Sequence, residues 1–130
     1  MSKLATFTPD VAKAMFDYTR QNPRNAKAEL AESVWGFGFT KDSPRQIFSL
    51  SKMFTAVRGV YYGFTMKPTE EPLRFIVSFF EQRGEEGTRN LGDEVKHIAL
   101  IDDVPKVISN AANQAKTLAD ALRMEAGLPL

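Results

Sequence analysis

Apolar residues recur along most of the chain at the three- and four-residue intervals of an amphipathic helix. The clearest run follows 3-4-3-4-3 spacing, which is typical of a seam between packed helices. Its members are Ile47, Leu50, Phe54, Val57, Tyr61 and Phe64. Ser43 and Gln46 precede the run as a capping box, in which each side chain pairs with an orphan backbone amide. We therefore expect a long central helix over about 44–63.

A second run near the C-terminus predicts another long helix, over about 104–126. Its stripe has 4-3-4-3-4 spacing and consists of Val104, Ile108, Ala111, Ala115, Leu118 and Leu122. Asp103 precedes it as a cap and Gly127 follows it as a stop. Because many of the side chains are alanine, whatever packs on this helix comes close.

The N-terminal third shows two more helix patterns. Thr8 and Pro9 form a start signal, and Asn22 with Pro23 ends that helix. The stretch from Arg24 to about Trp35 is rich in Ala, Glu and Lys, which favours a second helix. The two are expected to form an antiparallel hairpin.

Two later segments fit either a helix or a strand. Residues 73–80 are β-branched and aromatic, but an acidic cap before them favours helix. Residues 94–101 are short and ambiguous, and helix is again favoured. Residues 84–93 hold three glycines and are expected to form one long loop.

Together these patterns predict an all-α fold, with five or six helices in a single compact domain over 1–130. The chain has 130 residues, of which 43% are hydrophobic and 25% charged, as in an ordinary globular domain. It has no cysteine, so disulfides and thiolate metal sites are excluded. Neither a signal-peptide pattern nor a long apolar span is present, which favours a soluble cytoplasmic protein with no membrane partner.

Charge is unevenly distributed, although the net charge is only +1. Residues 40–68 carry five basic groups and one acidic group, giving +4. Residues 69–103 carry four basic and nine acidic groups, giving −5. Such blocks can pair within the chain, or they can attract a second copy of it.

The stretch Trp35-Gly-Phe-Gly-Phe-Thr40 matches the central positions of an RNA-recognition strand, in which aromatic rings stack bases. Its flanks do not match, because the signature requires a basic residue where Trp35 stands and an aromatic one where Asp42 stands. The two glycines instead favour a linker that ends the second helix. We expect Trp35, Phe37 and Phe39 to be core aromatics.

The block 40–68 also supports an alternative function, nucleic-acid binding. Eight of the fourteen aromatic residues lie between 35 and 64, interleaved with cations that can neutralise phosphates. The candidate contacts are Lys41, Arg45, Lys52, Arg58, Tyr62 and Lys67. This alternative includes a subunit that coats a nucleic acid.

Catalytic patterns are weaker. His97 is the only histidine, so the Glu94-x-x-His97 pair lacks the second pair that a di-iron helix bundle requires. Asp102 and Asp103 are explained as residues at a helix start. We expect no enzyme activity, no cofactor and no metal.

The favoured interpretation is a helical interaction protein that associates with itself, such as a structural subunit, an adaptor or a small inhibitor. The alanine-rich C-terminal helix is the expected contact surface. Its predicted interface residues are Ala111, Ala115, Leu118, Ala119 and Leu122.

Overall fold

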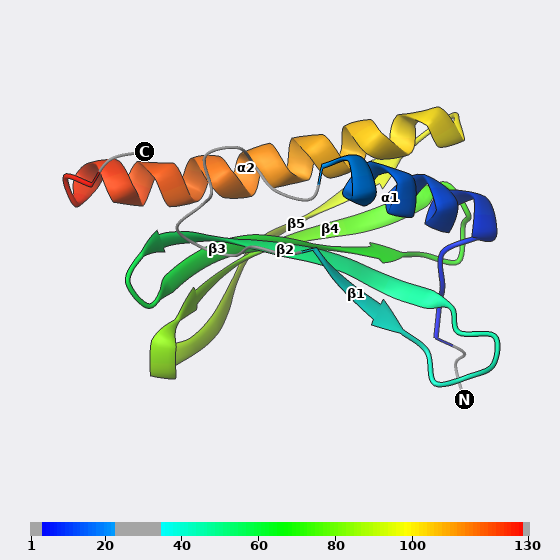
Figure 1. The fold of residues 1–130 in the computed structure, drawn as a ribbon, viewed down its shortest axis with the longest axis horizontal. Helices are drawn as coiled ribbons and strands as arrows, with labels where there is room; N and C mark the ends of the chain where they lie inside the picture. Colours follow the sequence, from blue (N-terminus) through cyan, green and yellow to red (C-terminus); the bar gives the residue numbers. More distant parts are fainter. Residues whose placement is uncertain (1–3, 23–34, 129–130) are drawn as a thin grey trace.

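A computed structural model describes residues 4–22 and 35–128 of the chain. Two helices flank five strands in sequence order (Figure 1). The elements are α1 (Pro9–Gln21), β1 (Gly36–Phe39), β2 (Ile47–Val57), β3 (Val60–Pro68), β4 (Arg74–Arg83), β5 (Gly87–His97) and α2 (Val104–Glu125). Short 3-10 turns at Gly84–Glu86 and Ile101–Asp103 precede β5 and α2.

The strands form one antiparallel sheet in the order β1-β2-β3-β4-β5, so each strand pairs with its neighbours in the chain. The predicted all-α fold of five or six helices is therefore wrong. The order of pairing also differs from the split topology of the RNA-recognition fold. As expected, Trp35 and Phe37 pack against the core, whereas Phe39 is 41% exposed, which contradicts its expected place in the core. Gly36–Phe39 is strand β1, not a linker.

The largest error concerns the expected helix over 44–63, which is the hairpin of β2 and β3. Its turn lies at Arg58 and Gly59, where a φ of 80° requires glycine. Alternation along β2 is hidden from the sequence because Lys52 occupies a buried position while Met53 is exposed. The apolar residues on both faces then happen to satisfy helical spacing as well.

Helix was favoured for residues 73–80 and 94–101, but residues 74–80 lie in β4 and residues 94–97 lie in β5. The acidic residues before β4 are part of a turn, in which the Thr69 hydroxyl donates to the Arg74 carbonyl at 2.7 Å. The expected loop over 84–93 contains a tight 3-10 turn and then the first half of β5. Glycines at 84 and 87 have positive φ and permit that turn.

The two helices with the strongest end signals are confirmed. Helix α1 begins at Pro9, where the Thr8 hydroxyl accepts from the Val11 amide at 3.4 Å, and it ends before Asn22. The C-terminal helix expected over 104–126 is α2, at Val104–Glu125. The expected helix from Arg24 to Trp35 lies outside the described residues, except for Trp35 itself.

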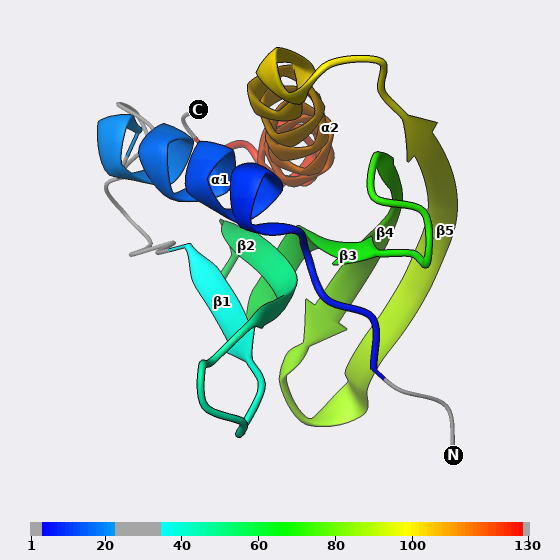
Figure 2. The ribbon, with the colours of Figure 1, turned by 90° about the vertical axis from the view of Figure 1, so that its right-hand side faces the viewer.

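Both helices lie on the same side of the sheet (Figures 1 and 2). Helix α2 crosses β2 and β3, and α1 lies beside it over β1 and β2. Ala111, Ala115 and Ala119 face the strands and are at most 3% exposed. Their small side chains bring α2 close to the fully buried Leu50 and Phe64, which form the centre of the core.

The opposite side of the sheet, which we call the open face, carries no helix among the described residues (Figure 2). Serine, threonine and glutamine alternate there with a few apolar side chains. The apolar members of the open face include Met53, Tyr61, Ile76, Phe80 and Val95. Within the described ranges, neither helix is long and apolar enough to cross a membrane.

Gly63 in β3 allows two neighbouring strands to pack on the open face. A Cβ at this position would lie 2.6 Å from the ring of Phe80 and 3.0 Å from Cγ of Met53, and it would also meet the Lys52 carbonyl. Only glycine therefore leaves room for the Phe80 ring to cross β3.

We expect Gly63→Val to destabilise the fold by about 1–3 kcal/mol or more, because the added side chain must displace Phe80 or the β2 backbone. Urea denaturation followed by circular dichroism measures this loss. Thr65→Val is the control, since it places the same side chain on the same strand and face at a position that already carries a Cβ. Equal stability of the two variants would contradict the close approach of Phe80.

Candidate interaction surface

Strand β5 forms one edge of the sheet and is much longer than β1, the strand at the other edge. It has 11 residues and pairs along its inner side with β4. Within the described part of the chain nothing pairs with its outer side (Figure 2). Such an edge presents free backbone donors and acceptors to solvent.

The pairing with β4 determines which backbone groups of β5 point outward. The Ile98 amide donates to the Leu73 carbonyl at 2.9 Å, and the same register continues to Arg74 opposite His97. Residues of an antiparallel strand alternate between bonding to one side and to the other. The backbone groups of Lys96 and Glu94 therefore bond to β4, and those of 93, 95 and 97 point to the free edge.

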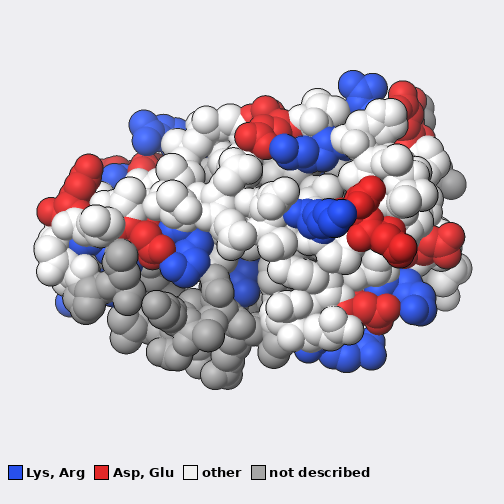
Figure 3. Space-filling model, turned by 90° about the horizontal axis from the view of Figure 1, so that it is seen from above, with Lys and Arg blue, Asp and Glu red and all other residues white. Residues whose placement is uncertain are grey.

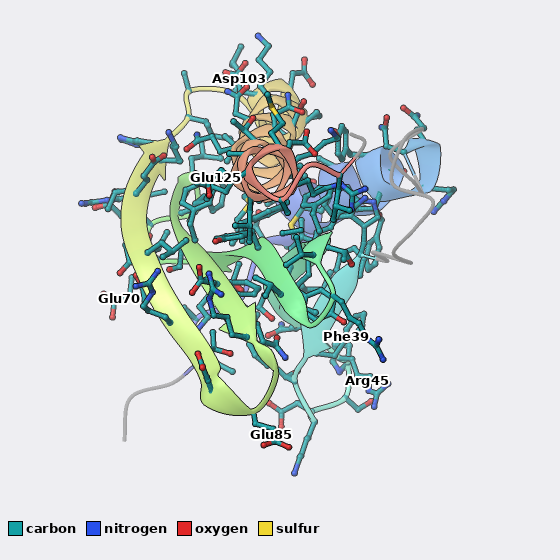
Figure 4. All side chains as sticks on the ribbon, turned by 90° about the vertical axis from the view of Figure 1, so that its left-hand side faces the viewer. Phe39, Arg45, Glu70, Glu85, Asp103 and Glu125 are labelled. Atoms are coloured by element: carbon teal, nitrogen blue, oxygen red, sulfur yellow. The ribbon has the colours of Figure 1, made fainter. Side chains whose placement is uncertain are left out.

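The outer part of β5 also exposes an apolar side chain. Val95 is 56% exposed and faces Ile76 across the strand pair on the open face. A shallow hollow beside it is closed at one end by the turn between β3 and β4, where Glu70 projects at the margin of the sheet (Figure 4). Its lining consists of Thr69, Glu70, Glu71, Arg74, Ile76 and Val95.

Charges of both signs occur along residues 93–97 of β5, with the acidic residues before Val95 and the basic residue after it. On the helix side, the Glu94 carboxylate lies 2.9 Å from the Lys96 ammonium. On the open face, Asp93 accepts from the Asn90 side chain at 3.0 Å. That hydrogen bond, together with a second from Ser78 and the charge of Lys67, lowers the pKa of Asp93. The Asp93 carboxylate thus remains ionised at neutral pH.

A second polar cluster surrounds Glu81 on the helix side of β4. The Tyr62 hydroxyl donates to its carboxylate at 2.6 Å, and Arg83 Nε donates at 2.9 Å. The guanidinium of Arg89 on β5 lies 3.4 Å away. The hydrogen bonds from Arg83 and Tyr62 lower the pKa of Glu81 to about 2. All of these contacts are internal, so the cluster fixes β4 and β5 in register.

Lys52 is a buried cation held by aromatic rings. Its ammonium lies 4.2 Å from the ring centroid of Trp35 and 5.5 Å from that of Phe54, and the residue is only 3% exposed. Burial lowers its pKa. The cation–π contact offsets part of the desolvation cost and ties Trp35 to β2.

The residues predicted to bind nucleic acid do not form one patch. Lys52 and Tyr62 are buried on the helix side. Arg45 lies beside Phe39 in the connection between β1 and β2, with its guanidinium 6.0 Å from the ring centroid (Figure 4). The other three lie in separate places, namely Lys41 in that connection, Arg58 in the turn between β2 and β3, and Lys67 on the open face. On the helix side, the described basic and acidic side chains are interspersed (Figure 3).

Most residues predicted to form a helical interface pack against the protein's own sheet. Ala111, Ala115 and Ala119 pack on the sheet, and Leu122 is partly buried against the same core. Leu118 alone of the five is exposed, at 38%. The close packing expected of α2 thus occurs with its own sheet.

The candidate catalytic residues are separated. Glu94 and His97 lie on opposite faces of β5, because side chains alternate along a strand. Asp102 and Asp103 lie in the 3-10 turn before α2. Over residues 4–22 and 35–128, no group of three or more His, Asp or Glu side chains is placed to hold a metal ion. Comparison of the chain with protein-family models, curated proteins and solved structures finds no match.

The outer edge of β5 was not predicted from the sequence. Residues 93–97 read Asp-Glu-Val-Lys-His, in which a single apolar residue stands between charges of opposite sign. That order indicates an edge strand, because charged side chains on an edge strand limit unspecific pairing with other chains. It becomes visible only after the segment has been assigned as a strand.

We expect part of the acid sensitivity of the fold to come from Glu81. Its pKa is near 2 in the folded protein and ordinarily 4.5, so its contribution to stability is complete above pH 4.5 and is lost as pH falls towards 2. Glu81→Gln should lower the melting temperature at pH 7, with the difference from wild type shrinking between pH 4.5 and 2. Thermal melts across this range test the expectation. Glu85→Gln, at the exposed hairpin turn (Figure 4), should melt like wild type throughout.

Proposed function

We propose that this protein is a non-enzymatic assembly subunit that associates with itself through the outer edge of β5. One observation carries the proposal, namely the regular edge segment 93–97 with outward-pointing backbone groups and the exposed Val95. Adding a strand to this edge satisfies the backbone hydrogen bonds and covers the apolar side chain. The open face then continues from one subunit into the next.

The charge distribution supports association with an identical chain. The edge carries acidic and basic side chains within three residues of each other, so two copies running antiparallel can place opposite charges face to face. The basic residues considered for nucleic acid are dispersed over three regions of the surface or buried, so no shared phosphate-binding surface adds support to that alternative.

The proposal is tested with Val95→Pro. Proline removes the outward-pointing amide of Val95, while the bonds that tie β5 to β4 come from the residues on either side. We expect wild-type protein to show at least twice the monomer mass by light scattering at micromolar to millimolar concentrations, and Val95→Pro to be monomeric.

Val95→Thr is the matched control, since it keeps the amide and the β-branched shape. It should retain most of the association, and all three proteins should show the same far-ultraviolet circular dichroism. A wild-type protein that stays monomeric at every concentration would overturn the proposal. Association that survives Val95→Pro in the folded protein would move the contact to another surface.

A further inference from the structure

We infer that two copies of this chain pair β5 with β5 in one antiparallel register, centred on Val95. The inference rests on the proposed self-association and specifies its partner and geometry. Antiparallel pairing of identical strands has a two-fold axis at one residue or between two residues. The structure of β5 decides between these possibilities.

The direction in which the backbone groups of β5 point excludes half of the possible β5–β5 registers. Within the regular segment 93–97, residues 93, 95 and 97 direct their amides and carbonyls to the free edge. Paired strands must place outward-pointing residues opposite one another to form hydrogen bonds. A two-fold axis that falls between two residues would oppose outward-pointing and inward-pointing residues, so the axis must pass through a residue.

Registers centred before residue 93 would cross the irregular pairing of β5 with β4 between Asn90 and Gly92. Among the registers centred within 93–97, charge and strand length leave one. An axis through a residue places that residue opposite its own copy. At Asp93, Glu94 or Lys96 the axis would bring like charges together, which destabilises a strand pair. An axis at His97 would require pairing by residues beyond the end of β5. Val95 is the remaining centre, and there two exposed apolar side chains meet.

The other pairs in this register are complementary. Glu94 on the helix side lies opposite Lys96 of the second copy, and the reverse pair is formed by symmetry. On the open face Asp93 lies opposite the second copy's residue 97, a histidine. Each of the three outward-pointing positions exchanges two backbone hydrogen bonds with its partner.

The proposed register also brings two exposed leucines near the interface. Leu91 and Leu100 are 39% and 63% exposed, and they lie four residues before and five residues after the proposed centre. The register therefore brings Leu91 of one copy beside the segment that carries Leu100 in the other. Contact between them would bury two further apolar side chains that are exposed in the single chain.

The overall product is a continuous sheet of ten strands, five from each copy. The two-fold axis stands perpendicular to the sheet, so the helices of both copies lie on one side. The open faces join on the other side, and neither helix layer has to move.

The register is tested by cysteine cross-linking, for which the chain is suited because it has no cysteine. In the proposed dimer the Cα atoms of the two Val95 residues lie about 5.5 Å apart, within the range that a disulfide bridges. Oxidised Val95→Cys should therefore run as a covalent dimer, at least ~10-fold above Asp93→Cys, whose two copies are separated by four residues or about 13 Å.

Asp93→Cys and His97→Cys should cross-link when mixed, although neither does so alone. Covalent dimers of Asp93→Cys alone, or none from Val95→Cys while the folded wild type is a dimer, would overturn the register and leave the proposed self-association intact. A monomeric wild type would instead remove both.

Charge exchange gives an independent test. The Glu94→Lys variant has basic residues at both 94 and 96, and the Lys96→Glu variant has acidic residues at both. The dissociation constant of each variant's dimer should therefore be at least about five-fold higher than that of wild type. Mixing the two should restore dimers, because each Lys then faces a Glu. If the mixture associates no better than its components, the pairing of Glu94 with Lys96 across the interface is wrong.

Discussion

The structure depends on the close contact between α2 and the strands β2 and β3. Alanines at 111, 115 and 119 let the helix approach the sheet, and the large side chains of the core come from the strands. Because the apolar surface of α2 is directed at its own sheet, a single helical layer is enough to close the core. Among the described residues, the same contact leaves one sheet face without a helix and leaves β5 as a free edge of the sheet.

Polar side chains inside this arrangement orient the strands. Lys52 lies among aromatic rings beneath the helices. The Glu81 carboxylate accepts a hydrogen bond from Tyr62 and forms ion pairs with Arg83 and Arg89. Each group requires specific partners when it is buried. A shifted pairing of β2, β3 or β4 would therefore leave a buried charge without its partner. These interactions favour one register, whereas the helix contact alone would tolerate several.

The two helices with start signals in the sequence were predicted correctly, although Thr8 caps α1 and the Asp103 side chain makes no capping hydrogen bond to α2. Every strand was missed. Thr8 and Asp103 are local signals, so they were readable without tertiary contacts. Strand pairing is not local, and here both faces of the central hairpin carry apolar residues, so the two-residue period was masked. The candidate interaction edge was missed for the same reason, since Val95 is recognised as an exposed edge residue only once its neighbours are known.

Strand β1, at the opposite edge, has consequences for how assembly would end. It has only four residues and a shift in its pairing with β2 at Gly38 and Phe39, so it offers little backbone for another chain to extend. Within the described residues, each molecule thus has one edge suited to pairing, and the proposed dimer would use the edges of both molecules. In the proposed assembly, growth by sheet extension would therefore stop at a closed particle of two chains, and a strand-rich protein would be protected from forming open-ended fibres.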